Sequence, residues 1–274
     1  MPDVPAVSVI IAVFNAAPFL DECLDSLVAQ TFEDWEVVAC DDASTDRSVE
    51  ILERWSRRDS RIRVVRNAVN LGAAATRNRA IEMCRGKYIA IQDADDLSKA
   101  DRLERQVSYL DANPGCAFVS SGLYLFDDMG IYGQRIPGIP LPGRRDFLVN
   151  TPYCHASTMF RRLAIESVNG YRVATETTRG QDYDLFMRLH ADGFQGHNIP
   201  DCLYGYRDGC MAYHRRRFRY RLDEVVIRFK GFRQLGLLPW AIPFVFKPVL
   251  VGAIPSILLR RVKRVADRPS LAHS

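Results

Sequence analysis

Three aspartates stand at the end of the segment YIAIQDADD, residues 88–96. Asp93, Asp95 and Asp96 follow an apolar run that has the length of a buried strand. Carboxylates a few ångströms apart repel each other by roughly 4 kcal/mol per pair at an effective dielectric constant near 20, and they raise each other's pKa. A divalent cation, Mg²⁺ or Mn²⁺, would turn this repulsion into binding, usually through one or two carboxylates with substrate phosphates and water. An isolated D-x-D is also common in turns before helices, so its meaning depends on the other motifs of the chain.

Two further acids follow the apolar segment WEVVAC, residues 35–40. Asp41 and Asp42 could accept hydrogen bonds from a base or a ribose, although an Asx turn with a helix N-cap explains them equally well when they are taken alone. In NLGAAATRNRAIEMC, Gly72 and three alanines let a ligand approach a helix start, and Arg77 could reach phosphate or base; the alternative for Arg77 is a solvated charge. Neither GxxxxGK[ST] nor GxGxxG is present, which excludes the Walker and dinucleotide fingerprints.

The elements that would position these residues alternate between strand and helix over residues 1–120. Short runs rich in Val and Ile predict strands covered on both faces, and apolar residues at helical spacing predict the helices between them. The predicted strands are 7–14, 35–40, 62–66, 88–92 and 116–122. This order predicts an α/β fold with a mostly parallel sheet and helices on both faces. Ligands bind beyond the carboxyl ends of such strands, so the acidic pairs should converge on one site.

The pattern is looser between residues 123 and 206. A hairpin is predicted about Asp128–Gly130. HASTMFRR, residues 155–162, predicts a strand that runs into a helix. In residues 177–193, apolar side chains at helical spacing predict a helix with Asp182 at its start.

Composition is that of an ordinary globular protein: 274 residues, 47% hydrophobic and 26% charged. Seven scattered cysteines without a C-x-x-C pair argue against a disulfide framework or a zinc knuckle and for a reducing compartment. The first twenty residues have no basic region of a signal peptide, so we expect a cytoplasmic protein. Residues 201–274 hold 15 Lys and Arg against five Asp and Glu, whereas the whole chain has a net charge of +4. The basic C-terminal part therefore suggests an anionic partner, a membrane or a nucleic acid.

In order and spacing, four segments together resemble the family-2 inverting glycosyltransferases of GT-A fold: SVIIAVFNAAPFLDECLDSLVAQTFEDWEVVACDDASTD, NLGAAATRNRAI, GKYIAIQDADD and GQDYDLFMRL. The resemblance covers roughly residues 6–207 and implies a Rossmann-like sheet. It divides the domain into a nucleotide-sugar-binding half, 1–122, and an acceptor-side half, 123–207. Residues 208–274 form a basic and apolar C-terminal helical tail, for which we expect membrane-surface association.

The resemblance also implies roles for single residues. Asp182 would be the catalytic general base. Asp95 would hold a divalent metal, Mn²⁺ or Mg²⁺, that bridges to the donor diphosphate. The donor-binding positions would be Val13, Asn15, Asp41, Asp42, Arg77, Asp93, Ala94 and Asp95; phosphate or lid contacts would come from Arg207 and His214; His155 and Gln181 would lie on the acceptor side.

The chemistry of the residues agrees with this assignment. Displacement at an anomeric carbon needs a base for the acceptor hydroxyl and stabilisation of the departing nucleoside diphosphate. The first could be Asp182, and a metal on Asp95 could provide the second as a Lewis acid. A single displacement inverts the anomeric configuration.

Two positions depart from the family pattern. Gln181 stands where the family usually has Glu before the base, and Gly209 stands where many members carry a histidine. A catalytically impaired nucleotide-sugar-binding scaffold subunit is therefore one alternative. A sugar nucleotidyltransferase is the other, although NAAPF after the first strand lacks the Gly-rich basic loop of that class. Multiple membrane spans and the QxxRW motif of processive synthases are absent from the sequence.

The segment LLPWAIPFVFKPVLVGAIPSILL, residues 237–259, has one charge, Lys247, and four prolines. It could lie in the membrane interface, pack as a helical pair, or span the bilayer, which the prolines and the lysine disfavour. Nucleic-acid binding lacks a recognisable module. We therefore expect an inverting transferase that takes a UDP-, dTDP- or GDP-sugar to a glycan or lipid-linked acceptor of the cell envelope. It would be cytoplasmic and peripheral at the anionic inner face of the membrane, and would not bind nucleic acid.

Overall fold

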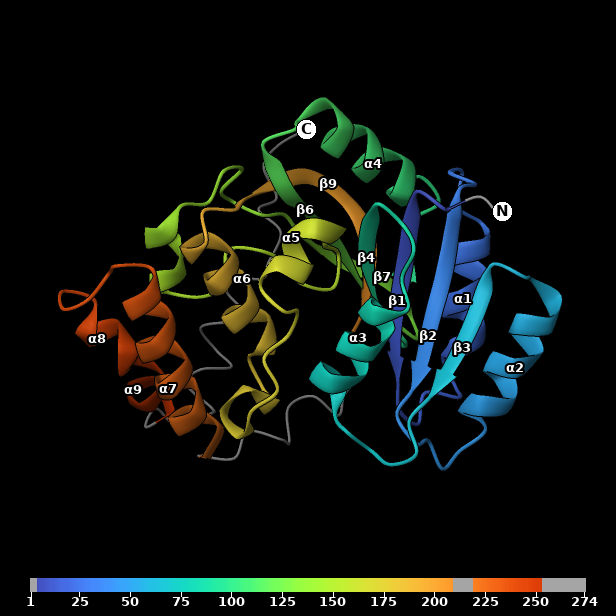
Figure 1. Cartoon of the computed structure of the whole chain (residues 1–274), viewed down its shortest axis with the longest axis horizontal. Coiled ribbons are helices and arrows are strands. Elements are labelled where there is room, and N and C mark those ends of the chain that lie inside the picture. Colours follow the sequence, from blue (N-terminus) through green and yellow to red (C-terminus); the bar gives the residue numbers. More distant parts are fainter. Residues whose placement is uncertain (1–3, 209–218, 253–274) are drawn as a thin grey trace.

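The computed structural model describes residues 4–208 and 219–252 (Figure 1). Its strands form one sheet in the order β3-β2-β1-β4-β8-β6-β9-β5, with β7 paired to β6. The strands are β1 Val7–Val13, β2 Trp35–Asp41, β3 Ile62–Arg66, β4 Tyr88–Asp93, β5 Leu97–Ser98, β6 Cys116–Asp127, β7 Gly130–Arg135, β8 Met159–Arg161 and β9 Gln195–Arg207. The helices are α1 Leu20–Val28, α2 Ser48–Arg58, α3 Ala73–Glu82, α4 Arg102–Ala112, α5 Arg162–Ser167, α6 Gln181–Ala191, α7 Arg219–Gln234, α8 Ile242–Val245 and α9 Lys247–Gly252, with 3-10 turns η1 Arg144–Leu148 and η2 Thr175–Thr178.

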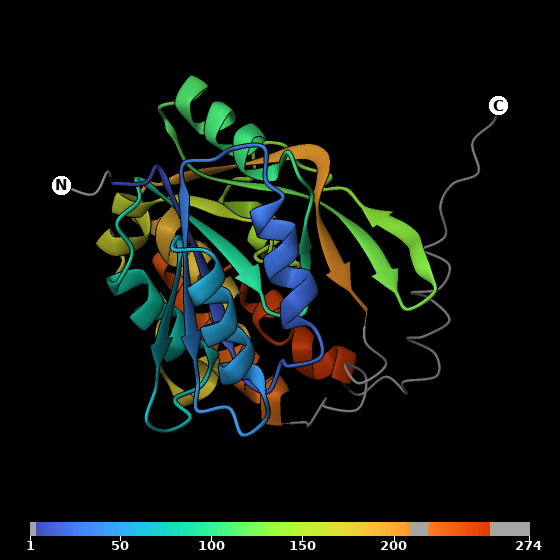
Figure 2. The same cartoon turned by 90° about the vertical axis from the view of Figure 1, so that its right-hand side faces the viewer.

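The first half of the sheet is parallel, as predicted. β1 lies between β2 and β4, and β2 continues to β3, all in parallel register. Alternate residues of β1 face opposite layers: Val9 and Ile11 pack with α1, α2 and α4, whereas Ile10 packs with α3, α5 and α6. Figure 2 shows α1 and α2 in front of these strands. The predicted α/β fold class with helices on both faces is confirmed.

The second half of the sheet is mixed. β8 is antiparallel to β4 and β6, and β6 is parallel to β9. The predicted hairpin exists as β6 and β7, with Asp127 opposite Gly130. β9 was not predicted, because Pro200 and polar residues interrupt its alternation; its register against β6 also shifts at Gly122. The two-residue β5 is too short to leave a periodic signal.

The described part of the C-terminal tail packs on the segment between residues 123 and 207. Leu237, Ala241 and Val245 are buried in the same core as α6. Arg228 of α7 is buried, and its guanidinium donates to the carbonyl oxygens of Leu148 at 2.8 Å and of the next residue at 2.9 Å. No helix within 4–208 and 219–252 has both the length and the apolar character that crossing a bilayer needs. Residues 253–259 of the apolar segment lie outside the described residues.

Candidate active site

The carboxyl ends of β1, β2 and β4 bring the two acidic pairs to one edge of the sheet. Val13, the last residue of β1, is in register with Asp41, and Ala12 is in register with Asp93. Since β1 lies between the other two strands, both acids flank the same strand end. The predicted convergence of the acidic pairs is therefore present in the fold.

The carboxylates of Asp41 and Asp42 have different surroundings. Asp42 accepts hydrogen bonds from the backbone nitrogens of Leu71 at 2.8 Å and Gly72 at 2.9 Å, and from the amide of Asn67 at 2.8 Å. Burial by itself would raise the pKa of Asp42, but these donors lower it below its usual value. Asp41 is fully buried, and its Oδ1 has no partner among the described residues. Asp42 thus holds the loop before α3, whereas Asp41 keeps one carboxylate oxygen without a partner among the described residues.

The turn after β1 is tied to the turn after β2. Asn15 has φ = 51°, and its side-chain oxygen accepts a hydrogen bond from the backbone nitrogen of Thr45 at 2.8 Å. The backbone nitrogen of Asn15 donates to Ser44 Oγ at 3.0 Å. The carbonyl of Val13 accepts from the nitrogen of Asp42 at 2.7 Å, and the Val13 side chain is buried. Val13 and Asn15 therefore shape the wall of the candidate nucleoside site, and these contacts occupy the Val13 carbonyl.

The three acids of the DADD turn have distinct environments. Asp95 is exposed, and its carboxylate accepts no hydrogen bond from another described residue. Partial desolvation and the charge of Asp93 raise the pKa of Asp95. Asp96 is 2% exposed; its Oδ1 accepts from the nitrogen of Arg207 at 2.8 Å and its Oδ2 has no described partner. Burial, followed by repulsion from Asp93, raises the pKa of Asp96 to about 8. Ala94, which stands between Asp93 and Asp95 in the sequence, is buried.

Asp93 is paired with Arg77 rather than left free. A guanidinium nitrogen of Arg77 lies 2.7 Å from Asp93 Oδ1. Burial would raise the pKa of Asp93, but the positive charge of Arg77 lowers it below its usual value. The predicted direct contact of Arg77 with phosphate or base therefore has a competing partner within the protein. The same guanidinium lies 5.8 Å from the ring centre of Tyr171.

His155 joins this group from the segment that precedes β8. Its Nε2 lies 2.7 Å from the hydroxyl of Tyr171. Burial, and then the nearby Arg77, lower the pKa of His155 to about 4, so that it is neutral near pH 7. The charge of Asp182 acts on Arg77, His155 and Tyr171, which places these groups in one electrostatic unit.

The start of α6 presents Gln181 and Asp182. The helix follows Gly180, which has φ = 102° and lies close to Ile227 of α7. The carboxylate of Asp182 has no hydrogen-bond or ion-pair partner among the described residues. Asp184, two residues later, pairs instead with Arg172, which precedes the helix, at 2.7 Å and with Arg188 of α6 at 2.8 Å. Of the two acids in the first turn of α6, Asp182 is therefore the one available to take a proton.

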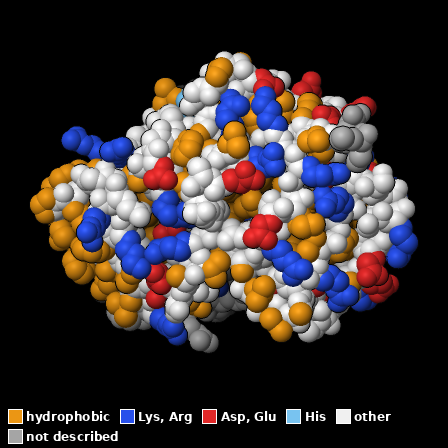
Figure 3. All heavy atoms as spheres, in the orientation of Figure 1, with side chains coloured by type: hydrophobic (Ala, Val, Ile, Leu, Met, Phe, Trp, Pro, Cys, Tyr) orange, Lys and Arg blue, Asp and Glu red, His pale blue; other side chains and the backbone are white. Residues whose placement is uncertain are grey.

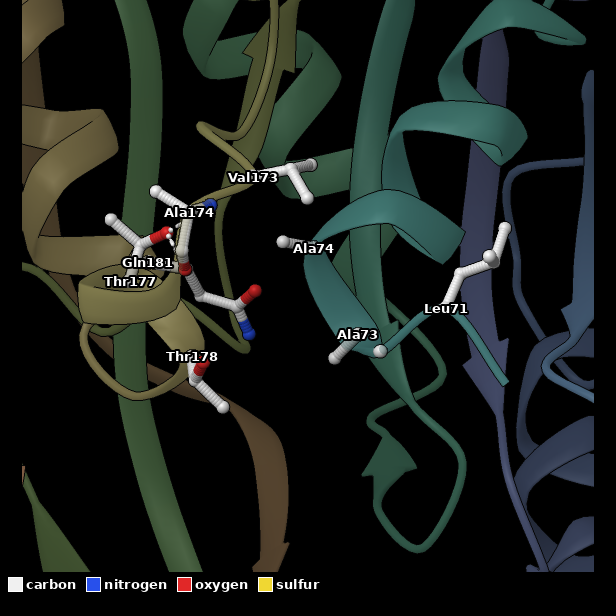
Figure 4. Close-up of a pocket in the computed structure, with 9 residues that line it drawn as sticks. Leu71, Ala73, Ala74, Val173, Ala174, Thr177, Thr178 and Gln181 are labelled. Carbon is white, nitrogen blue, oxygen red and sulfur yellow. Dashed lines mark hydrogen bonds between the residues drawn. The ribbon is translucent and has the colours of Figure 1, made fainter. Parts of the chain in front are cut away.

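A hollow of about 120 Å³ separates the start of α6 from the start of α3. Figure 4 shows Gln181 extending toward Ala73 and Ala74 across this space. Leu71, Gly72, Ala73, Ala74, Val173, Ala174, Thr177, Thr178 and Gln181 line it. The small residues of α3 thus leave room between the start of α3 and the start of α6.

Arg207 closes the DADD turn from β9. Its Nε donates to the carbonyl of Asp95 at 2.9 Å, and its terminal nitrogen pairs with Glu22 of α1. The guanidinium also lies over the ring of Phe126, 4.5 Å from its centre. Arg207 is therefore adjacent to the predicted phosphate position, with its donors shared with the protein. His214 lies outside the described residues.

Three buried residues that support the DADD turn were not predicted from the sequence. Gln92 donates to the carbonyl of Asp96 at 2.9 Å and accepts from buried Arg102 at 3.0 Å. The hydroxyl of Tyr204 accepts from the nitrogen of Asp93 at 3.0 Å. One signal existed: Arg102 and a glutamine four residues later share the helix face that Leu103, Val107 and Leu110 bury.

The described residues contain no cluster of three or more His, Cys, Asp or Glu side chains that could hold a metal by themselves. The free, exposed carboxylate of Asp95 fits the common mode in which a cation takes one or two protein carboxylates and completes its shell with phosphates and water. Asp93 can contribute only in competition with Arg77. The residues therefore fit a cation that arrives with a diphosphate.

Comparisons with known proteins agree with this geometry. The family described as "Glycosyl transferase family 2" matches residues 8–168. The chain is 35% identical over 268 residues to "Putative glycosyltransferase EpsE" of Bacillus subtilis, with 96% of each chain covered. S. aureus TarS 1-349 in complex with UDP-GlcNAc has a similar structure, with a TM-score of 0.71, 17% identity, and 88% of this chain and 72% of that chain covered. The Pyrobaculum calidifontis mannosyltransferase PcManGT, in complex with GDP-Man and Mn²⁺, gives a TM-score of 0.60, 20% identity and coverages of 98% and 82%.

Proposed function

Because the chain belongs to glycosyl transferase family 2 and is a glycosyltransferase, we propose that it transfers a sugar from a nucleotide sugar with inversion, using Asp182 as the general base. One contrast carries this proposal. Asp182 and Asp95 have carboxylates without a hydrogen-bond or ion-pair partner among the described residues, whereas the neighbouring Asp184 and Asp93 are paired with arginines. A base must be free to take a proton, and a metal ligand must be free to bind.

The donor nucleoside would lie against Asp41, whose Oδ1 has no described partner in a fully buried position. A ribose or base group that donates a hydrogen bond would satisfy this oxygen, which otherwise carries a desolvation penalty. Asp42 and Asn15 would hold the loops that form the pocket. UDP-, dTDP- and GDP-sugars remain the proposed donor classes.

A divalent cation, Mn²⁺ or Mg²⁺, held by Asp95 would stabilise the charge that develops on the departing nucleoside diphosphate. In our proposal, Arg77 keeps the charge of Asp93 balanced, so that its second carboxylate oxygen can accept a ribose hydroxyl. Neutral His155, hydrogen-bonded to Tyr171, would orient the acceptor without competing for the proton.

On the acceptor side, Asp182 would take the proton of a hydroxyl as its oxygen attacks the anomeric carbon. The bond to the diphosphate oxygen breaks as the new glycosidic bond forms, so one displacement inverts the configuration. Gln181 would face the transferred sugar across the hollow beside α3. The proposed acceptor is a glycan or a lipid-linked glycan, and the proposed location is the cytoplasmic face of a membrane.

The test compares nucleotide-sugar hydrolysis and transfer with Mn²⁺ in matched variants. Asp182→Asn should lower kcat by roughly 10²- to 10⁴-fold while the donor still binds. Asp192→Asn, an exposed acid just beyond the other end of α6, is the control and should retain wild-type activity. If Asp182→Asn turns over like the wild type, the proposed base is wrong. If the wild type binds the donor but neither hydrolyses nor transfers it, the chain is a binding subunit.

The metal site has its own comparison. Asp95→Ala should abolish the dependence of donor binding on Mn²⁺, measured by thermal shift with a panel of UDP-, dTDP- and GDP-sugars. Asp128→Ala, an exposed acid of the β6–β7 turn, is the control. Equal Mn²⁺ dependence in both variants would remove Asp95 from the metal site.

A further inference from the structure

The helices of the C-terminal part carry a concentration of exposed apolar side chains. Figure 3 shows hydrophobic side chains gathered over the side of the molecule on which α7, α8 and α9 lie in Figure 1. The exposed large residues of this part are Leu222, Val226, Phe229, Trp240, Ile242, Phe246 and Leu250. Scattered single apolar residues are normal on a surface, but a contiguous patch indicates an interaction surface.

Folding covers one side of this segment and leaves the other bare. Leu237, Ala241 and Val245 are buried against the domain. Trp240 is 49% exposed and Phe246 is 52% exposed. Solvent-exposed aromatic side chains on a helical surface are typical of proteins that bind at a membrane interface.

Positive charge borders the patch. The guanidinium of Arg145 lies over Trp240, 5.6 Å from the ring centre. Arg233 is exposed at the end of α7, whereas the ammonium of Lys247, the first residue of α9, donates to the carbonyl oxygen of Val149 at 2.7 Å. No acid occurs between residues 235 and 252. Cations beside apolar side chains complement the phosphate headgroups and acyl boundary of an anionic bilayer.

We infer that this patch, defined by Trp240, Ile242, Phe246 and Leu250 with Arg145 and Arg233 at its border, docks the enzyme onto an anionic lipid bilayer. Trp240 and Phe246 enter the headgroup–acyl boundary, and the two arginines contact lipid phosphates. The inference rests on the proposed function in one respect, the lipid-linked acceptor. α7 packs directly behind the start of α6, since Ile227 meets Gly180, so docking brings the side of the molecule that carries Asp182 toward the membrane.

Trp240 offers a direct readout in the full-length protein. The other two tryptophans, Trp35 and Trp55, are 2% and 3% exposed, so a lipid-induced change in emission reports on Trp240. Vesicles that contain about one third phosphatidylglycerol should shift the emission to shorter wavelength, and brominated acyl chains should quench it. Vesicles of phosphatidylcholine alone should do neither, and high salt should weaken the effect because it screens the arginines.

Flotation with the same vesicles tests the residues. The double variant Trp240→Ala/Phe246→Ala should bind about tenfold more weakly or worse, since losing even part of two aromatic side chains removes over 1.4 kcal/mol of burial. Met129→Ala/Ile131→Ala removes two exposed apolar residues of the β6–β7 hairpin and should float like the wild type. Trp240→Phe should also float, and Arg145→Gln/Arg233→Gln should lose the preference for anionic lipid.

Donor hydrolysis in solution separates this inference from the proposed function. The Trp240→Ala/Phe246→Ala variant should hydrolyse the donor at the wild-type rate, and Asp182→Asn should float like the wild type. A wild-type protein that does not bind anionic vesicles overturns the inference, as does a double variant that floats unchanged. Self-association that the double variant abolishes, without vesicle binding, would assign the patch to a protein interface and also overturn it.

Discussion

Arg77 of α3 places a guanidinium nitrogen 2.7 Å from a carboxylate oxygen of Asp93 at the end of β4. The ion pair means that one acid of the DADD turn already has a counter-charge from the protein. Asp95, in contrast, is exposed and uncommitted. Because the two acids differ in this way, the pair favours Asp95 over Asp93 as the ligand of the proposed cation.

Replacement of Arg77 by methionine should leave the carboxylate of Asp93 without its positively charged partner. The pKa of Asp93 should rise, since the guanidinium lowers it in the wild type. Breaking a partly buried, hydrogen-bonded charge pair costs about 2 kcal/mol or more, so kcat/KM should fall roughly 30-fold. Steady-state kinetics at saturating Mn²⁺ measures this loss. Arg57→Met, an exposed arginine of α2, is the control, and equal kinetics for the two variants would contradict the role given to the pair.

Asp96 should make metal-free stability depend on pH. Burial raises its pKa to about 8, so the folded chain keeps a proton that the unfolded chain loses above about pH 4. The contribution of Asp96 to folding stability therefore falls as pH rises from about 4 to 8. Asp96→Asn should melt at least roughly 5 °C above the wild type at pH 9 in EDTA, with a smaller difference at pH 5. A difference that does not grow with pH, or the same growth in Asp127→Asn, would show that Asp96 ionises normally.

The first half of the fold could be predicted from the sequence because its signals are local. Each predicted strand up to β4 is a short run in which apolar residues predominate over a few polar ones, such as Ser8, Glu36 and Arg63, and such runs are typical of a sheet covered on both faces. The convergence of the acids at the strand ends then follows from the topology, because neighbouring parallel strands have their carboxyl ends at the same edge of the sheet. The register of β1 and β2, in which Val13 pairs with Asp41, places these two strand ends side by side.

The second half of the site could not be predicted in the same way. β9 pairs with β6 through shifted register and contains Pro200, so no periodic pattern marks it. The partners of the acids are also long-range: Arg77 reaches Asp93 across 16 residues, and Arg207 reaches Asp96 across 111. The sequence could therefore identify which residues lie at one site, but it could not predict which of their carboxylates are bound by other side chains or backbone groups of the protein.

Gln181→Glu should move the pH dependence of the reaction. The substitution restores the acid that the family resemblance implies at this position, and it puts a second carboxylate next to Asp182. A like charge nearby raises the pKa of a carboxylate, so the acidic limb of the kcat–pH profile should shift upward. Gln134→Glu, on β7, is the control and should leave the profile unchanged. An unchanged profile in Gln181→Glu would mean that the two side chains do not share a local field.

Arg102 should stabilise the DADD turn through Gln92 and Tyr204. Its guanidinium is fully buried, bonds Gln92 at 3.0 Å, and lies 4.8 Å from the ring centre of Tyr204, and Gln92 and Tyr204 both bond the backbone of the DADD turn. Arg102→Lys keeps the charge but replaces the planar fork of five donors by a compact ammonium with three, which cannot span all the partners of the guanidinium. We expect a stability loss of about 2 kcal/mol and a concentration of Mn²⁺ for half-maximal activity that rises about tenfold.

A double-mutant cycle with Gln92→Leu separates this positioning effect from a general loss of stability. If Arg102 acts through Gln92, the double variant should need no more Mn²⁺ than the worse of the two single variants, because either change already loosens the turn. Arg105→Lys, an exposed cation on the same helix, should behave like the wild type. Independent, additive effects of the Arg102 and Gln92 substitutions on the Mn²⁺ requirement would show that the arginine supports the fold without positioning the acids.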